Sequence, residues 1–368
     1  MKRSVPDSND KQLVVREILE RRELEMLSPN ASFSAHTKGR KIVEPKDKLR
    51  TEFQRDRDRV IHTNAFRRMK HKTQVFIAPV GDHFVTRLTH TLEVTQIART
   101  IARSLGLNED LAEAAALGHD VGHTPFGHVG EQVLDAIHPG GFRHNEQSLR
   151  TIDTLEKNGK GLNLTYETRQ AILHHSKPRG NFMSASELGL LTLEAQIVRI
   201  SDAIAYLAHD IGDAIRARVL DESDLPVEAR EILGTRHSQR VDTMVNDVVA
   251  NSYNEATSSV EKLSRNPILS MSPEVTGVVT SLREFMFDRV YMPAGDGAEG
   301  EKAREIIEFL YEYFHRNSQE IPERFFQEDD NVGRAIVDYI AGMTDQFAIY
   351  TVEGLKPGIT ADVFLGRV

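Results

Sequence analysis

The segment from residue 191 to 220 is the feature that most constrains the fold of this chain. Its apolar residues recur every three or four positions, the spacing of one face of an α-helix. This stripe consists of Leu193, Ile197, Ile200, Ile204, Leu207, Ile211 and Ile215. The opposite side carries Asp202, Tyr206, His209, Asp210 and Asp213 by the same geometry. In an isolated helix that side would be a solvated face. If Asp202 binds a ligand, its neighbours one and two turns further on would face the site too.

Helical spacing also dominates the rest of the chain, and no stretch shows the sustained alternation typical of a half-buried strand. Further helices are expected over residues 11–25, 86–105, 109–117, 145–156, 165–175, 227–253, 259–263, 274–291, 302–316 and 332–345. An acidic, glycine-rich loop is expected over residues 292–300. The chain is therefore predicted to be all-α.

Composition narrows the functional classes. The chain has 368 residues, no cysteine and a formal net charge of -9. The absence of cysteine excludes disulfides, thiolate metal sites and cysteine nucleophiles. The negative charge argues against a surface built for non-specific nucleic-acid binding, although a local site for nucleic acid stays open. No apolar run approaches the ~20 residues needed to span a membrane, and no signal-peptide pattern begins the chain, so we expect no membrane association and a cytoplasmic location.

Residues 118–131 form a segment of unusual composition, Gly-His-Asp-Val-Gly-His-Thr-Pro-Phe-Gly-His-Val-Gly-Glu. Glycines allow the backbone to make turns and close approaches that other residues resist. One interpretation is a turn between two helices that happens to carry histidines. The other is a ligand site, and it is favoured because ten of the fifteen histidines lie between His83 and His209.

A divalent metal site could be built from His90, His119, Asp120 and Asp202. Two imidazoles and two carboxylates suit Mn, Mg, Fe or Zn, and they leave positions open for water or substrate. A lone histidine in an apolar helix is more often a structural residue than a ligand, so the prediction depends on the whole set.

The same four positions reproduce the H…HD…D pattern of the HD phosphohydrolase superfamily. The segments 55–62, 65–69, 72–76, 87–90, 119–131, 142–148 and 342–345 together resemble the deoxyguanosine-triphosphate triphosphohydrolases, a family of dNTP triphosphohydrolases. The resemblance extends from about residue 38 to residue 345. It implies an all-α HD-domain helical bundle with a helical C-terminal extension. We accordingly expect a polar N-terminal segment over 1–48, the HD-domain core over 49–220, and a helical region over 221–368 that completes the same body.

The resemblance further implies metal-dependent hydrolysis of a dNTP to a deoxynucleoside and inorganic triphosphate. The metal ligands would be His90, His119, Asp120 and Asp202. His128 would be the general acid for the leaving oxygen, with Glu131 orienting it, and His144 and His123 would approach the phosphates. Arg87 would contact the phosphates through its planar guanidinium group. Tyr206, Asp210 and, more weakly, Gln74 would contact the sugar. Each of these residues could instead have a packing or ion-pairing role.

Several points stay open at the level of sequence. The chain is shorter than the best-known members of the family, so it could prefer dGTP or accept dNTPs more broadly. The basic cluster between Arg55 and Arg68 could be an ion-paired surface or could line a nucleotide effector site between the subunits of a homo-oligomer, which the resemblance also leads us to expect. Two alternative functions are another HD phosphohydrolase acting on nucleoside monophosphates, cyclic nucleotides or guanosine polyphosphates, and a non-catalytic nucleotide sensor.

Overall fold

The computed structural model describes residues 14–77, 83–176, 188–258, 266–327, 331–360 and 363–364. Across these residues the chain forms helices and turns without a β-strand; extended pairing is limited to isolated bridges at Arg40–Thr165 and Thr73–Thr86. The predicted all-α fold is confirmed. No helix in the described ranges has the length and apolar character needed to cross a bilayer.

The first part of the chain supplies the helices that surround the site. They are α1 (Val15–Met26), α2 (Glu52–Ile61), α3 (Asn64–Arg68), α4 (Arg87–Ser104), α5 (Glu109–Gly118), α6 (Gly127–Ile137), α7 (His144–Arg150), α8 (Glu156–Gly159), α9 (Tyr166–Leu173) and α11 (Leu193–Arg216). Several begin at a residue whose side chain accepts a hydrogen bond from the third backbone N–H beyond it: Thr86 for α4, Asn108 for α5, Thr165 for α9 and Thr192 for α11. Such N-caps satisfy backbone donors that a helix leaves unpaired.

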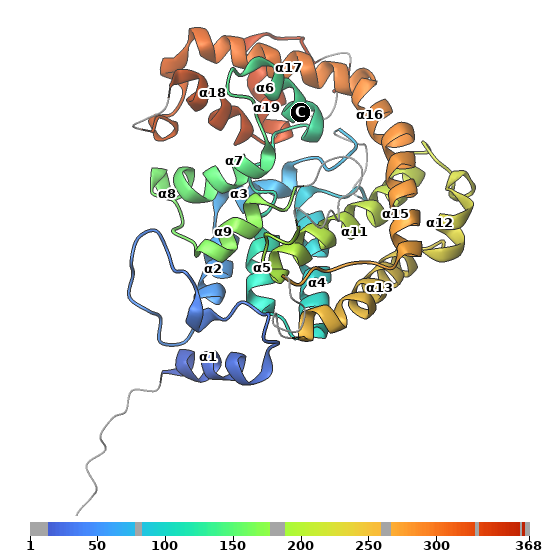
Figure 1. The fold of residues 1–368 in the computed structure, drawn as a ribbon. Helices are drawn as coiled ribbons and strands as arrows, with labels where there is room; N and C mark the ends of the chain where they lie inside the picture. Colours follow the sequence, from blue (N-terminus) through green and yellow to red (C-terminus); the bar gives the residue numbers. More distant parts are fainter. Residues whose placement is uncertain are drawn as a thin grey trace, which may run out of the picture.

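The second part of the chain contributes α12 (Val227–Ile232), α13 (His237–Thr257), α15 (Pro273–Met286), α16 (Met292–Asp296), α17 (Ala298–Arg316), α18 (Val332–Ala341) and α19 (Asp345–Leu355). In Figure 1, α15, α16 and α17 follow one another around the outside of the molecule. Helices α17, α18 and α19 gather around α6, which comes from a distant part of the sequence.

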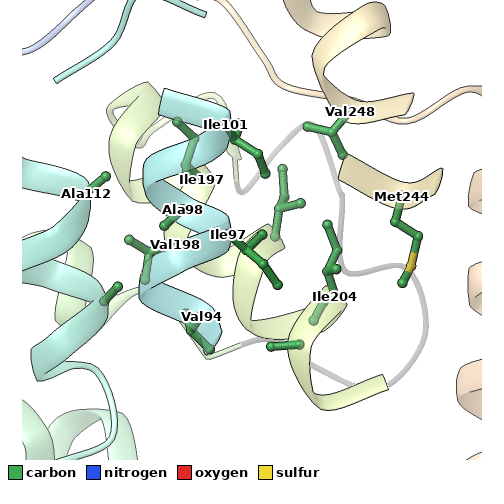
Figure 2. Close-up of a cluster of buried hydrophobic side chains, with 14 of the residues drawn as sticks. Val94, Ile97, Ala98, Ile101, Ala112, Ile197, Val198, Ile204, Met244 and Val248 are labelled. Carbon is green, nitrogen blue, oxygen red and sulfur yellow. The ribbon is translucent and has the colours of Figure 1, made fainter. Parts of the chain in front are cut away.

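Helices α4, α5 and α11 pack together at the centre of the molecule (Figure 1). Figure 2 shows the apolar side chains of α4 and α11 meeting those of α13. The labelled members are Val94, Ile97, Ala98, Ile101, Ala112, Ile197, Val198, Ile204, Met244 and Val248, all at most 1% exposed. Burying a large aliphatic side chain contributes about 1.5–3 kcal/mol, so this cluster holds α4, α5 and α11, which carry the site, against one another and against α13.

Helix α11 has no solvated face of the kind an isolated helix would have. His209, Asp210 and Asp213 are 3%, 2% and 2% exposed. The backbone N–H of Val85 donates to Asp213, and the hydroxyl of Tyr291 donates to Asp210. The residues before α4 and those after α15 therefore cover the polar side of α11, and the solvated-face interpretation is wrong.

The C-terminal helices share a second apolar core with α6. This core joins Phe126, Val133 and Leu134 to Leu310 of α17 and Ile349 of α19. The carboxylate of Asp345 strengthens the connection, since it accepts hydrogen bonds from the backbone N–H groups of Phe126 and Thr73 at 2.9 Å each. The C-terminal region therefore supports the segment that leads into α6.

Several elements differ from the sequence prediction, and α2, α3 and α6 were not expected as helices. Residues 292–300, expected as a loop, form α16 and the start of α17, because proline is tolerated in a first helical turn and the break is confined to Gly297. The helix expected over 227–253 is divided into α12 and α13 at Gly234, whose φ of +91° does not suit a helix. Helix α19 was not anticipated beyond residue 345. The helix expected over 259–263 lies outside the described residues.

Asp338 of α18 is fully buried and links the C-terminal region to α7. It accepts hydrogen bonds from Gln147 at 2.9 Å, Arg150 at 2.8 Å and Arg334 at 2.6 Å. We expect Asp338→Ala to lower the free energy of unfolding by about 3 kcal/mol, the lower end for breaking a buried ion pair, because both arginines keep some solvent contact. Urea denaturation measures this. Glu312→Ala, which removes an exposed ion pair with Arg316, should change stability by less than about 1 kcal/mol; equal effects would contradict the structural importance of Asp338.

Candidate metal centre

Three central helices bring the predicted metal ligands together. His90 lies in the first turn of α4, His119 and Asp120 directly follow α5, and Asp202 lies in the middle of α11. The side chain of Asp202 is 15% exposed, whereas His90, His119 and Asp120 are almost completely buried. The packing of α4, α5 and α11 thus places residues from distant segments in one buried cluster.

The ligand atoms of these residues face a common point. His90 Nε2 lies 3.1 Å from Asp202 Oδ1 and 4.0 Å from Asp120 Oδ2. His119 Nε2 lies 3.6 Å from Asp120 Oδ2 and 3.9 Å from Asp202 Oδ1. Among the described residues, no hydrogen-bond partner serves the buried Nε2 of His119. A buried polar atom without a partner is costly, and a cation bound at this point would satisfy it.

The neighbouring groups hold the ligands in states suited to metal binding. His119 Nδ1 lies 2.6 Å from the carbonyl oxygen of Ala116, and His90 Nδ1 lies 2.9 Å from His209 Nε2. Such partners fix the tautomer and direction of a metal-binding imidazole. Burial lowers the pKa of His90 more than Asp202 raises it, which favours the neutral ring. The donor set therefore fits a divalent cation of the Mn, Fe, Zn or Mg type.

Arg87 lies directly beside Asp120. Its Nη1 donates to Asp120 Oδ2 at 2.7 Å, and the side chain is almost fully buried. Burial opposes ionisation of Asp120, but His119 and Arg87 outweigh it and hold the pKa of Asp120 well below its usual range. A β-carbon added at Gly127 would lie 3.2 Å from Arg87 Nη2 and 3.3 Å from the carbonyl oxygen of Gln74, so Gln74 also borders this region.

A group of histidines surrounds Glu131 beside the four-residue cluster. Both carboxylate oxygens of Glu131 lie 2.9 Å from His144 Nδ1, and the closest oxygen lies 3.5 Å from His128 Nδ1 and 3.8 Å from His123 Nε2. The ring of His123 stacks on that of His144, whereas the side chain of His128 is 69% exposed. Glu131 therefore holds His144 more closely than His128, the partner expected from sequence.

Neighbouring charges shift the pKa values of His144 and Glu131 in this group. Burial lowers the pKa of His144, but the charge and hydrogen bond of Glu131 outweigh burial and raise it overall. Burial raises the pKa of Glu131, yet the neighbouring His144 and His128 hold it well below its usual range. The pair is consequently a carboxylate beside a readily protonated imidazole, and His144 lies within 4.8 Å of a ligand atom of Asp120.

Tyr206 and Asp210 lie one and two turns beyond Asp202 on α11. The hydroxyl of Tyr206 accepts a hydrogen bond from Arg283 Nε at 2.6 Å, and Asp210 accepts one from the hydroxyl of Tyr291 at 2.8 Å. Arg283 and Tyr291 were not predicted as site residues. Arg283 lies in α15 and Tyr291 ends the π-helical segment Phe287–Tyr291 that follows it, and no local pattern distinguishes either residue.

His175 and His209 were also not assigned to the site from sequence. Nε2 of His175 lies 3.8 Å from Asp120 Oδ1 and 3.2 Å from His144 Nε2. Burial, with His119 and His144 nearby, lowers the pKa of His175 to about 3. His209 contacts His90 as described above. The high density of histidines was the available signal, but it did not single out these two.

Arg55 and Arg59 of the basic cluster line a separate cavity of about 320 Å³. The cavity is lined by Asp47, Arg50, Arg55, Asp58, Arg59, His62, Thr63, Glu156, Lys157 and Leu162. Arg55 and Arg59 both pair with Glu44, and Arg57 pairs with Asp58. These contacts agree with the ion-paired alternative, while the effector alternative stays a prediction.

Family models place this fold and site in a known class. Residues 87–207 match the HD domain, which contains all the predicted metal ligands, and residues 269–353 match a phosphohydrolase-associated domain. The HD match begins at the first residue of α4 and ends within α11, so it spans the helices that build the cluster.

Several curated relatives named deoxyguanosinetriphosphate triphosphohydrolase-like protein are similar over nearly the whole chain. One from Caldanaerobacter subterraneus subsp. tengcongensis is 52% identical, covering 91% of this chain and 94% of its own. One from Desulfatibacillum aliphaticivorans is 47% identical, covering 92% and 96%. One from Clostridium perfringens is 47% identical, covering 90% and 95%. The chain therefore belongs to the deoxyguanosinetriphosphate triphosphohydrolase-like family, and the predicted family is confirmed. A solved structure of a hypothetical protein from Aquifex aeolicus aligns with a TM-score of 0.47 at 18% identity, covering 84% of this chain and 70% of that one.

Proposed function

We propose that this protein hydrolyses deoxynucleoside triphosphates to a deoxynucleoside and inorganic triphosphate with the help of a divalent metal. The observation that carries the proposal is the convergence of His90, His119, Asp120 and Asp202, where His119 Nε2 has no hydrogen-bond partner among the described residues. When bound there, a divalent cation would supply Lewis-acid polarisation of a phosphate oxygen.

In the proposed reaction, water adds to the α-phosphorus and the bond from phosphorus to O5′ breaks. The leaving oxygen needs a proton, because an alkoxide is a poor leaving group. We assign this proton to His128, which is solvent-accessible beside Glu131, and Glu131 would position the ring. His144 and His123 would flank the phosphates from the buried side. Arg87, whose Nε has no hydrogen-bond partner within the described residues, would donate to phosphate oxygens.

The sugar would lie along α11 between Tyr206 and Asp210. The carboxylate of Asp210 can accept a hydrogen bond from the 3′-hydroxyl, and the ring of Tyr206 would crowd a 2′-hydroxyl. Gln74 would border the same pocket. We further propose that the protein is a homo-oligomer and that residues 49–220 form its catalytic core. The base preference and a nucleotide effector at the basic cluster are left to experiment.

The reaction is tested by incubating the protein with each dNTP and Mn²⁺, singly and mixed, and separating the products by anion-exchange chromatography. Inorganic triphosphate and a deoxynucleoside are the expected products, and the single-substrate reactions give the base preference. Phosphate or pyrophosphate would instead indicate another HD phosphohydrolase activity. No product with any nucleotide, alone or combined, would favour a nucleotide sensor.

The sugar assignment predicts a change in specificity. In Tyr206→Ala the ring that crowds C2′ is absent, so the ratio of kcat/KM for dGTP over GTP should fall by about 10- to 100-fold, the range for one steric contact in a pocket. Tyr206→Phe keeps the ring and loses only the hydroxyl bonded to Arg283, and it should keep most of the discrimination. Equal ratios in wild type and Tyr206→Ala would show that Tyr206 does not read the sugar.

A further inference from the structure

The chain enters α6 through a turn with an unusual backbone conformation. Phe126 has a φ of 60° and a ψ of 24°, and Gly127 follows with a φ of 58°, so two consecutive residues are left-handed. Glycine adopts this conformation readily, whereas a bulky aromatic residue keeps it only where its surroundings hold it there. The turn at residues 123–126 therefore depends on the groups that contact it.

His128 depends on this turn for its direction. It is the second residue of α6, and its side chain is 69% exposed, so neighbouring side chains cover little of the ring. A β-carbon added at Gly130 would collide with the carbonyl oxygen of Pro125, which shows that the first turn of α6 lies directly on the residues before it. A change in the turn would therefore move His128 relative to Glu131.

Asp345 holds the end of the turn. Its Oδ1 accepts a hydrogen bond from the backbone N–H of Phe126 at 2.9 Å, and its Oδ2 accepts one from the backbone N–H of Thr73 at 2.9 Å. Asp345 is the first residue of α19 and is 6% exposed. The ring of Phe126 also stacks on that of Phe364, with the ring centroids 6.3 Å apart. The C-terminal region thus fixes both the backbone and the side chain of the left-handed residue.

Lys72 holds the beginning of the same turn. Its Nζ donates to the carbonyl oxygens of His123 and of Ala341, the latter at 2.7 Å, and the residue is 2% exposed. The carbonyl oxygen of Lys72 accepts a hydrogen bond from the backbone N–H of Arg87, the first residue of α4. A buried donor and a buried acceptor therefore hold residues 123–126 between the start of α4 and the C-terminal region.

We propose that Asp345 and Lys72 are positioning residues for proton transfer, because they fix the turn that directs His128 toward the leaving oxygen. This inference rests on the proposed function, in which His128 gives its proton to O5′. Neither residue contacts the nucleotide in this arrangement, since both are buried and both bind backbone groups of the turn. The C-terminal region would thereby contribute to the protonation step without supplying a metal ligand.

The test is a double-mutant cycle between Asp345 and His128, measured as kcat for the release of inorganic triphosphate. Asp345→Ala should lower kcat by about 10²-fold, the cost of misplacing a reacting group by about 1 Å. In a His128→Ala background the same substitution should lower kcat by less than about twofold, because no ring is left to position. Equal losses in both backgrounds, or no loss in the first, would overturn the proposal.

Lys72→Met provides an independent second variant. Methionine fills a similar space but cannot donate to the carbonyl oxygens of His123 and Ala341, so the same dependence on His128 is expected. The matched control is Glu353→Ala. Glu353 also lies on α19 and accepts hydrogen bonds from backbone N–H groups, those of Gly358 and Thr360, in the segment that follows the helix. This control should keep the wild-type kcat.

Failure of the inference and failure of the proposed function give different results. A wild-type protein that releases no triphosphate from any dNTP would overturn both. An active wild type in which the loss from Asp345→Ala or Lys72→Met is the same with and without His128 would overturn the inference alone. The Mn²⁺ content of both variants should equal that of wild type, since neither residue belongs to the proposed metal centre.

Discussion

Asp202→Asn is expected to reduce kcat for dNTP hydrolysis by at least ~10³-fold while the protein remains folded. An amide is a poor replacement for a carboxylate ligand, and Lewis-acid stabilisation of phosphate is worth several kcal/mol, with each 1.36 kcal/mol a factor of ten. Asp202 is a better choice than Asp120, because Asp120 also holds the buried guanidinium group of Arg87. Steady-state rates at saturating Mn²⁺, together with the metal content of the desalted protein, measure the effect.

The matched control for this variant is Asp242→Asn. Asp242 is an exposed aspartate on α13, away from the cluster, and its replacement should leave both rate and metal content unchanged. The urea midpoint of Asp202→Asn should stay close to that of wild type. Wild-type activity and metal content in Asp202→Asn would remove Asp202 from the metal centre.

His128→Ala is expected to lower kcat by about 10²- to 10⁴-fold, the usual contribution of a general acid. The side chain is 69% exposed, so its removal leaves no cavity in the core. The decisive comparison uses a phosphodiester with a p-nitrophenolate leaving group, which departs without a proton. If His128 protonates the leaving oxygen, the loss with that substrate should be much smaller than the loss with a dNTP.

His315→Ala provides the corresponding control, since His315 is an exposed histidine on α17. It should hydrolyse both substrates at the wild-type rate. Equal losses with the two substrates in His128→Ala would assign His128 to substrate binding or local structure rather than to proton transfer. Glu131→Gln should show the same substrate dependence in weaker form if it acts by positioning His128.

The parts of the site that could be predicted from sequence are those marked by local pattern. His119 and Asp120 are adjacent in the chain, and Asp202 lies on a helix whose apolar stripe gives its orientation. Arg283 and Tyr291 could not be found in this way. They reach Tyr206 and Asp210 only because α15 and the following turn pack over the polar side of α11, and no local periodicity encodes that contact.

The same distinction separates the parts of the fold that could be predicted from sequence from those that could not. The long helix α11 and its neighbours have regular apolar spacing and capping residues, and they were located closely. The loop predicted over 292–300 is wrong because glycine and proline content alone does not exclude a helix, and Pro293 occupies a first helical turn. The polar side of α11 was ambiguous for a physical reason: an isolated helix and a helix covered by later segments have the same sequence pattern.

The two apolar cores can be completed at different times while the chain is being synthesised, because their residues come from different parts of the sequence. All four proposed metal ligands are present once residue 202 and its helix have emerged, and their supporting core needs α13 and α15 but not the last helices. Helix α6, with His128 and Glu131, gains its apolar cover only when α17 and α19 follow. Under the proposed function, the capacity to bind metal should therefore precede the capacity to hydrolyse nucleotide while the chain is being translated.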